Sequence, residues 1–350
     1  MKKMFSLLFA VTMVVLLAAC GSNSSNETGN SSAKNTPEPG TNAENKPDHG
    51  KLTIGMSNSI LSIDFFVALK QGVEQGAAKN GYQVINTNAN GDAAKQVADI
   101  EDMIQKGVDA IIVNPQDVDA IVPAIEKANQ AKIPVIALDR GASAGELLSF
   151  LETDNVEMGR KAADYIAEKL KEKNGDYIGN VVELQGLLGT TAARDRGKGF
   201  NDQMQQKYPD IKIVARQAAD FNQEKALNVT TNILQGNAQI DAIFGHNDDN
   251  TVGAANAIDQ AGRFKPIGDK EHIVIIGIDG TRQAIQAIKD GRIDATISQV
   301  PIEMGEMAVE YAKQALVDQK TVEKHTFTRN FLVTKENVDK EKLWATELKN

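Results

Sequence analysis

Short apolar runs alternate with longer amphipathic segments along most of this chain, from Lys51 to near its end. The short runs predict β-strands, and several of them are continuous in Val, Ile and Leu instead of alternating with polar residues. Such runs are typical of parallel strands that are covered on both faces. The expected strands are Leu52–Met56, Tyr82–Asn86, Ala110–Val113, Val135–Leu138, Leu148–Leu151, Asn180–Leu184, Ile211–Arg216, Ala242–Phe244, Ile273–Ile276, Ala295–Ile297 and Thr328–Val333.

The segments between these runs carry apolar residues at a spacing of three or four, which predicts helices with one face in the core. The clearest stripes are Phe66, Leu69, Val73 and Ala77; Val97, Ile100, Met103 and Ile104; Ile121, Ala124 and Ala128; and Ala162, Tyr165, Ile166 and Leu170. Residues that favour the start of a helix precede three helical runs: Asp154 or Asn155, Thr190–Thr191, and Asp248. Glycines stand where a left-handed residue would end a helix: Gly81, Gly107 and Gly291.

The repeated alternation of strand and helix predicts an α/β fold with parallel sheets and right-handed crossovers. The series divides near Thr153–Asp154 into two similar halves. The 300 residues from position 51 onward also exceed the usual size of a single hydrophobic core. We therefore expect two doubly wound, Rossmann-like lobes.

The first 50 residues have a different composition. Met1-Lys2-Lys3 precedes an apolar run that ends in Ala18-Ala19-Cys20, the order of a secretory signal peptide, and this run is too short to span a membrane. Leu-Ala-Ala-Cys resembles the bacterial lipobox, whose cysteine takes a diacylglycerol and becomes the new N-terminus; the alternative is an ordinary signal peptide with an incidental cysteine. We expect a lipoprotein signal peptide over residues 1–20, lipidation at Cys20, and a flexible linker over residues 21–50, which are rich in Asn, Ser and Gly.

Composition narrows the classes of partner. The chain has 38 Lys and Arg against 47 Asp and Glu, a net charge of -9, and no basic cluster beyond the leader, so nucleic acid is not an expected partner. Its one cysteine leaves the mature fold without a disulfide. The four histidines are scattered and lack metal-ligand spacing, so we expect neither a metal nor a cofactor.

Polar and aromatic residues follow the expected strands at their carboxyl ends, where open α/β sheets bind ligands. They are Ser59, Asn114, Asp139, Arg140, Gln185, Phe221, Asn247, Asp279 and Gln299, with Phe65 and Phe66 opening the first helix. Asn114-Pro115 is interpreted as a turn. Together with Arg196, the set offers two carboxylates and two guanidiniums, which leaves it about neutral. This balance suits an uncharged polyhydroxyl ligand whose ring packs against the phenylalanines.

Several motifs resemble those of the ribose-binding branch of bacterial sugar-binding proteins. They are Ser59…Phe65-Phe66, Ile112-Val113-Asn114-Pro115, Leu138-Asp139-Arg140, Thr153-Asp154-Asn155, Glu183-Leu184-Gln185-Gly186, Gly189 to Gly197, Ala219-Asp220-Phe221, His246-Asn247-Asp248, Asp279-Gly280-Thr281 and Ile297-Ser298-Gln299. The resemblance runs in order from Lys51 to about Asn337. It implies a periplasmic-binding-protein fold of type I, with two lobes joined by a hinge of three segments, a ligand between them, and delivery to an ABC permease.

Carried onto this chain, the resemblance implies lobes formed by residues 51–153 plus 300–328 and by residues 154–299 plus 329–350. The implied ligand-binding residues are Ser59, Phe65, Phe66, Asp139, Arg140, Arg196, Phe221, Asn247, Asp279 and Gln299. One position departs from the pattern, because Ser62-Ile63-Asp64 stands where ribose binders have Asn-Asn-Pro. Ile63 cannot replace a side-chain amide, so the expected ligand is a ribose-like pentose, a hexose or a cyclic polyol.

The leading interpretation is therefore a lipid-anchored, extracytoplasmic and monomeric solute-binding protein of an ABC importer. The composition of the linker favours a Gram-positive surface, and a periplasmic location would apply in a cell with two membranes. A second interpretation keeps the fold but makes the protein a sugar or furanosyl-signal receptor for a sensor kinase or chemoreceptor. An enzyme is disfavoured because the chain has no dinucleotide fingerprint, Walker loop or nucleophile elbow. Sugar-responsive repressors share the fold, but they carry a DNA-binding headpiece where this chain has an export signal.

A Cys20→Ala variant tests the anchor. We expect it to keep ligand binding and to be lost from the cell surface into the medium or periplasm, because two acyl chains give stable anchorage that the linker alone cannot. Immunoblotting of membrane and soluble fractions measures this, with a Ser24→Ala variant in the linker as control. A Cys20→Ala protein that stays membrane-bound would contradict lipidation at this residue.

Overall fold

The computed structural model describes residues 51–348. The predicted signal peptide, the predicted lipidation site Cys20 and the predicted linker all lie outside these residues. Within the described part of the chain, no helix is long and apolar enough to cross a membrane.

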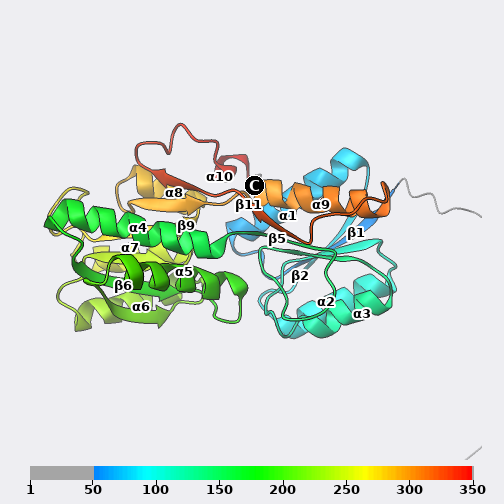
Figure 1. Ribbon diagram of the computed structural model, residues 1–350, viewed down its shortest axis with the longest axis horizontal. Helices are drawn as coiled ribbons and strands as arrows, with labels where there is room; N and C mark the ends of the chain where they lie inside the picture. Colours follow the sequence, from blue (N-terminus) through cyan, green and yellow to red (C-terminus); the bar gives the residue numbers. More distant parts are fainter. Residues whose placement is uncertain (1–50, 349–350) are drawn as a thin grey trace, which may run out of the picture. The chain divides into compact units, whose positions relative to one another are not determined.

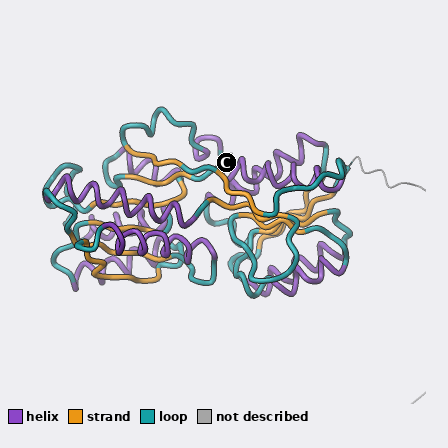
Figure 2. Tube along the Cα trace, viewed as in Figure 1, coloured by secondary structure: helices purple, strands orange, loops and turns teal. Residues whose placement is uncertain are grey.

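The described residues form two six-stranded sheets with helices on both faces of each (Figures 1 and 2). The strands are β1 (Thr53–Asn58), β2 (Gln83–Asn88), β3 (Ala110–Val113), β4 (Val135–Leu138), β5 (Ser149–Thr153), β6 (Gly179–Gln185), β7 (Ile211–Ala218), β8 (Ala242–Gly245), β9 (Val274–Asp279), β10 (Ala295–Ser298), β11 (His325–Thr328) and β12 (Phe331–Thr334). The helices are α1 (Asp64–Asn80), α2 (Ala93–Gln105), α3 (Val122–Gln130), α4 (Asn155–Asn174), α5 (Thr191–Lys207), α6 (Gln223–Gly236), α7 (Asp248–Gln260), α8 (Arg282–Lys289), α9 (Pro301–Leu316) and α10 (Trp344–Glu347).

The first sheet has the strand order β11-β5-β4-β3-β1-β2, and all its pairs are parallel. The second has the order β12-β10-β9-β8-β6-β7 and is parallel except that β12 runs antiparallel to β10. This confirms the predicted fold class of two doubly wound α/β sheets. The antiparallel edge strand is a departure from the expected parallel sheets.

The single strand expected over Thr328–Val333 is wrong. The structure has two strands there, β11 in the first sheet and β12 in the second, separated by Arg329 and Asn330. An apolar run predicts extended backbone but not which sheet pairs with it. The chain also passes between the sheets after Thr153 and after Ser298.

Alternation along the strands builds a separate core on each face of each sheet. In β3, Ala110 and Ile112 belong to the cluster under α1 and α9, whereas Ile111 and Val113 belong to the cluster under α2 and α3. In the second sheet, α4 and α5 cover one face, and α6, α7 and α8 cover the other. All four residues of β3 are fully buried, which explains why the strand is a continuous apolar run.

Local capping follows most of the sequence pattern. Asp154 and Thr190 are N-caps that accept backbone hydrogen bonds from Glu157 and Ala193. The expected cap at Asp248 is wrong, because Asn247 caps α7 and accepts from the backbone N–H of Asn250. Asp248 is the first helical residue, and its buried carboxylate instead accepts hydrogen bonds from the backbone of Gly280 and Thr281.

The last part of the segment 329–350 does not pack with the lobe to which the sequence analysis assigns it. Trp344, Ala345 and Leu348 are buried in the apolar cluster of α1, α9 and the first sheet. The large apolar side chains of Trp344 and Leu348 thus pack in that cluster, although β12 lies in the second sheet. The remaining lobe boundaries stay predictions.

Glycines allow two helix pairs to approach closely. A Cβ on Gly72 of α1 would lie 2.2 Å from the carbonyl oxygen of Ile302 in α9, and one on Gly305 would lie 2.4 Å from that of Leu69. In the pair α4 and α5, the corresponding positions are Gly159 and Gly199. Because the obstacles are backbone atoms, the helices would have to move apart to accept a side chain.

Gly72→Ala is therefore expected to lower the free energy of unfolding by about 1–3 kcal/mol, the usual cost of overpacking. Urea unfolding followed by circular dichroism measures it. Gly236→Ala is the matched control, since Gly236 ends helix α6 and a Cβ there has no neighbour within 4 Å. Equal stability of the two variants would show that the close crossing of α1 and α9 is not a constraint.

Candidate functional site

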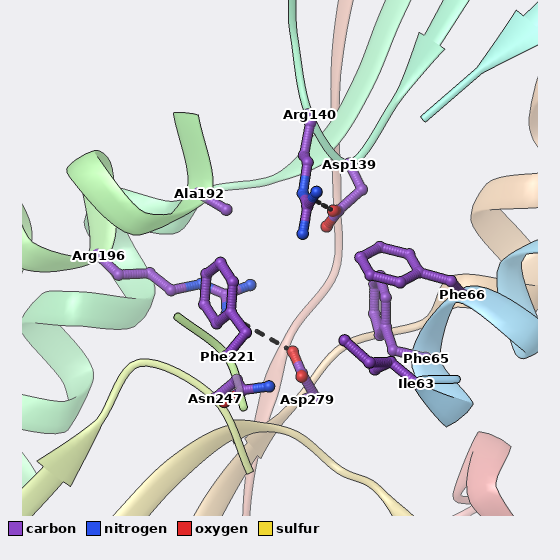
Figure 3. A pocket seen from close by; sticks show the side chains of 10 residues that line it. All are labelled: Ile63, Phe65, Phe66, Asp139, Arg140, Ala192, Arg196, Phe221, Asn247 and Asp279. Carbon is purple, nitrogen blue, oxygen red and sulfur yellow. Dashed lines mark ion pairs between the residues drawn. The ribbon is translucent and has the colours of Figure 1, made fainter. Parts of the chain in front are cut away.

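A small cavity lies where residues from the carboxyl ends of both sheets meet (Figure 3). Each sheet, together with its helices and loops, contributes five of the residues that line the cavity. They are Ile63, Phe65, Phe66, Asp139 and Arg140 on one side, and Ala192, Arg196, Phe221, Asn247 and Asp279 on the other.

Eight of the ten residues expected to bind ligand line this cavity. They are Phe65, Phe66, Asp139, Arg140, Arg196, Phe221, Asn247 and Asp279. The other two, Ser59 and Gln299, are buried behind the wall and reach it through hydrogen bonds. Ser59 Oγ donates to Asn114 Oδ1 at 2.5 Å, and Asn114 Nδ2 lies 3.4 Å from Asp139 Oδ2. Gln299 Nε2 donates to Asp279 Oδ1 at 2.7 Å.

Sequence reasoning did not include Ile63 and Ala192 among the lining residues. Ala192 precedes Arg196 by four positions in α5, so helical periodicity could have placed both on one face. Ile63 was noticed only as a departure from a motif, although it stands directly before α1 and its two phenylalanines. Asn114, interpreted as a turn residue, is buried and connects Ser59 to Asp139.

Two oppositely charged pairs dominate the electrostatics of the cavity, and Figure 3 marks both. Arg140 Nε lies 3.8 Å from Asp139 Oδ2, and Arg196 Nη1 lies 3.6 Å from Asp279 Oδ1. All four side chains are at most 6% exposed. Buried charges at such depth are tolerated when they are paired, and here the formal charges cancel.

Arg196 is oriented by two further hydrogen bonds. Its Nε donates to Asn155 Oδ1 at 2.9 Å, and its Nη1 donates to the carbonyl oxygen of His246 at 2.6 Å. His246 is in turn held by the buried Glu183, whose Oε1 is 2.9 Å from His246 Nε2. The guanidinium therefore enters the cavity in a single supported orientation.

In the pair that supports Arg196, His246 is neutral and Glu183 carries the charge. Burial lowers the pKa of His246, which favours the neutral imidazole. Burial alone would raise the pKa of Glu183, but hydrogen bonds from His246, Arg216 and Asn201 outweigh it and lower this pKa. Glu183 thus stays ionised and pairs with the partly exposed Arg216, whose Nε is 2.6 Å away.

Arg140 lies against aromatic rings from both sides of the cavity. Its guanidinium carbon is 4.9 Å from the centre of the Phe66 ring and 5.8 Å from that of Phe221. Nη1 donates to the carbonyl oxygen of Pro115 at 3.2 Å, whereas Nε is buried with no hydrogen-bond partner. The amide oxygen Oε1 of Gln299 is likewise buried without a partner. A buried polar group left unpaired costs about 1–3 kcal/mol, so both atoms favour a bound group that would satisfy them.

Three lining residues adopt positive φ angles that non-glycine residues rarely occupy. The values are 62° for Asp139, 58° for Phe221 and 129° for Asp279. Such conformations cost of order 1–3 kcal/mol each and gather at functional sites. Their presence at this cavity therefore favours a functional site there, on grounds separate from the chemistry of the side chains.

The cavity offers a definite set of interactions. Two carboxylates accept, two guanidiniums donate, the Asn247 amide does both, and three phenylalanine rings present apolar faces. Figure 3 shows Phe221 on one side of the space and Phe65 and Phe66 on the other. Among residues 51–348, no group of three or more His, Cys, Asp or Glu side chains could hold a metal ion. The arrangement can bind a small, neutral molecule that has hydroxyl groups at its edge and C–H groups on its faces.

Comparison with known proteins agrees with this chemistry. A family model described as the periplasmic binding protein domain matches residues 54–320. The chain is 41% identical over 280 residues to the ribose import binding protein of Bacillus subtilis (strain 168), which covers 80% of this chain and 86% of that protein. The chain belongs to the type I periplasmic sugar-binding proteins. The resemblance inferred from its motifs is thereby confirmed.

Relatives of this binding protein carry different ligands in their names. The xylitol-binding protein of Mycolicibacterium smegmatis is 33% identical over 279 residues, which cover 79% of this chain and 75% of that protein. A solved ABC-transporter solute-binding protein from Actinobacillus succinogenes, with bound D-allose, has a TM-score of 0.75 and 33% identity, and the match covers 83% of this chain and all of that one. Family membership therefore establishes the fold but not the individual ligand.

Burial raises the pKa of Asp279 well above the usual range for aspartate, against the effect of Arg196. Burial likewise raises the pKa of Asp139, and Arg140 and Arg196 oppose the shift. The folded binding protein thus retains protons at pH values where the unfolded chain, with ordinary carboxyl pKa values near 3.8, has released them.

A pH dependence of stability follows. Each of these two carboxyls binds more protons in the native state than in the unfolded state, so its own contribution to the free energy of unfolding without ligand should rise as the pH falls from 7 toward 5. Asp279→Asn should show a smaller rise, the difference being at most about 1.4 kcal/mol per pH unit. Urea unfolding at both pH values measures it, with the exposed Asp210→Asn as control. An unchanged slope in Asp279→Asn would mean that this carboxyl does not titrate differently in the native state.

Proposed function

We propose that this protein is a lipid-anchored, extracytoplasmic solute-binding protein that captures a monosaccharide or cyclic polyol and delivers it to an ABC importer. The observation that carries the proposal is the cavity with two buried charge pairs and three phenylalanine rings, built from residues of both sheets. Such a site suits a neutral ligand whose hydroxyl groups both donate and accept hydrogen bonds.

Each element of the cavity has a role in this proposal. Asp139 and Asp279 accept hydrogen bonds from ligand hydroxyls, and Arg140 and Arg196 donate to them. Charge-assisted hydrogen bonds of this kind are about twice as strong as neutral ones. The unpartnered Arg140 Nε becomes satisfied, and Phe66 and Phe221 pack on the apolar faces of the ring.

Binding is coupled to closure of the two lobes. The ligand contacts residues of both, so it interacts with more groups when the lobes are closed than when they are open. A ligand shifts such an equilibrium only by its differential affinity for the two states. We place the hinge at the three connections near Thr153–Asp154, Gln299–Val300 and Thr328–Asn330. The side chains of Thr153 and Thr328, 3.0 Å apart, join two of these connections.

Ile63 influences which ligand is accepted. It contributes an aliphatic side chain to the cavity wall at a position next to Phe65. A ligand hydroxyl directed at this side chain would lose its hydrogen bond to water without replacement, which costs about 1–3 kcal/mol. The ligand therefore presents C–H groups toward Ile63, and ribose itself is disfavoured relative to other pentoses, hexoses and cyclic polyols. Of the relatives' names, D-allose, a hexose, falls in this range, whereas the ribose binder and the binder of xylitol, an acyclic polyol, carry ligands outside it.

The remaining parts of the proposal concern location and partners. The lipobox-like sequence at Cys20 supports attachment to the outer face of the cell membrane, and residues 21–50 provide the reach to a permease. The protein is proposed to act as a monomer and to release its ligand chemically unchanged, because the relatives reported above carry names of binding proteins and not of enzymes.

Substitution of the buried pairs tests the binding function. Arg196→Ala and Asp279→Ala should each weaken binding of the preferred sugar at least about 30-fold, because truncating one member of a buried, hydrogen-bonded charge pair costs at least about 2 kcal/mol. A thermal-shift panel of pentoses, hexoses and inositols identifies that sugar, and titration calorimetry gives the affinities.

Arg292→Ala is the control for this experiment, since it removes an arginine whose ion pair with Asp259 is partly exposed and outside the cavity. Circular dichroism of each variant checks that the fold is intact. Unchanged calorimetric affinity in both cavity variants, or no binding of any compound in the panel by the wild type, would refute the proposed function.

A further inference from the structure

The last described residues form a short segment, Trp344–Leu348, that contacts elements of both sheets. We call this segment the C-terminal clasp. Figure 1 shows α10, its helical part, between α8 on one side and α1 and α9 on the other. The clasp follows β12 of the second sheet, yet its apolar residues are buried in the cluster of the first.

Apolar contacts join the clasp to the first sheet and its helices. The Trp344 side chain is buried, and its ring meets Phe65 edge to face, with centres 6.2 Å apart and planes at 87°. Aromatic pairs in this geometry contribute about 0.5–1.5 kcal/mol beyond the area that they bury. Phe65 lines the cavity, so Trp344 supports one wall of the site from behind.

Polar contacts join the same clasp to the second sheet. Arg282, the first residue of α8, donates from Nε to the carbonyl oxygen of Ala345 at 3.0 Å and from Nη2 to that of Leu348. From the other side, Gln71 Nε2 of α1 donates to the carbonyl oxygen of Glu347 at 3.1 Å. The carbonyl groups at the end of the clasp are thus held by one donor from each lobe.

The most specific contact is made by the indole N–H. Trp344 Nε1 donates to the backbone carbonyl oxygen of Asp279 at 2.8 Å, in a buried environment. Asp279 is the lining carboxylate with a φ of 129°, a conformation that its surroundings must maintain. The following amides, of Gly280 and Thr281, donate to the buried Asp248. The strained turn is therefore held by Asp248 at its amides, and at the Asp279 carbonyl by Trp344 together with the backbone N–H of Gln299, which donates at 3.1 Å.

We propose that Trp344 is a positioning residue for the ligand site, which acts by fixing the Asp279 peptide and the Phe65 ring together, and that the C-terminal clasp stabilises the ligand-binding arrangement of the two lobes. This inference rests on the proposed sugar-binding function. The clasp is a further crossing of the chain from the second sheet to the first, in addition to the three connections of the hinge. It ties α1 to α8, the helices that begin beside Phe65 and Asp279.

The substitution Trp344→Phe separates positioning from packing, because it keeps an aromatic ring beside Phe65 and removes the N–H donor to Asp279. Loss of one buried hydrogen bond should weaken binding of the panel sugar roughly 3- to 10-fold. The loss should appear as faster dissociation in stopped-flow measurements. A purely structural role would lower the unfolding temperature without ligand but leave affinity unchanged at temperatures well below it.

Two further variants complete the experiment. Lys340→Ala, exposed and outside the clasp, should bind like the wild type. Arg282→Lys keeps the charge, removes the forked donor to two carbonyl groups and should also accelerate dissociation, so it tests the clasp even if Trp344→Phe fails to fold.

Trp344 is the only tryptophan, so its fluorescence in the wild type should change when sugar saturates the site.

The outcomes distinguish the two proposals. Wild-type affinity and dissociation rates in both Trp344→Phe and Arg282→Lys would overturn the clasp while leaving sugar binding intact. Binding of no sugar in the panel by the wild type would overturn the proposed function and the clasp with it. Weaker binding in both variants, with Lys340→Ala unchanged, is the result expected.

Discussion

The structure depends above all on the requirement that four buried charges balance one another where the two sheets meet. Asp139 and Arg140 follow a strand of the first sheet, Arg196 lies in α5 and Asp279 ends β9 of the second sheet, and none is more than 6% exposed at its side chain. A single buried charge without a partner would be strongly unfavourable, whereas the balanced set is tolerated and offers both signs to a neutral ligand. The buried supports of Arg196, which include Asn155, His246 and Glu183, follow from the need to hold that charge in one orientation.

Several features of the same cavity lower the stability of the protein and favour the binding of a ligand. Three lining residues hold rare backbone conformations, and Arg140 Nε and Gln299 Oε1 lack partners. Each of these features costs free energy in the ligand-free protein and can be offset by a ligand that forms the missing contacts. Affinity and selectivity thus come from the same groups. Ile63 adds selectivity because it cannot form a hydrogen bond, so it disfavours ligands that direct a hydroxyl group at it.

Rigid helix pairs carry these groups. Gly72 and Gly305 let α1 and α9 meet at backbone distance, and Gly159 and Gly199 do the same for α4 and α5. Phe65 and Phe66 stand at the start of α1, and Arg196 lies in α5, so each close crossing fixes part of the cavity wall. The C-terminal clasp then connects the two walls through a single tryptophan that contacts Phe65 and Asp279.

The sequence by itself determined the α/β class, nearly every strand and helix, most helix caps and eight of the ten cavity residues, because these depend on local periodicity and on the rule that parallel strands end at one edge. Tertiary structure alone decided the rest. The run from Thr328 to Val333 is divided between two sheets. Ser59 and Gln299 lie behind the cavity wall, whereas Ile63 and Ala192 line it. Trp344 contacts Phe65, although it follows a strand of the other sheet. A local pattern records which face of an element is buried, but it holds no information on which distant element covers that face. The cavity lies between two separately patterned sheets, so its final lining and its support by the clasp exist only once both are folded and brought together.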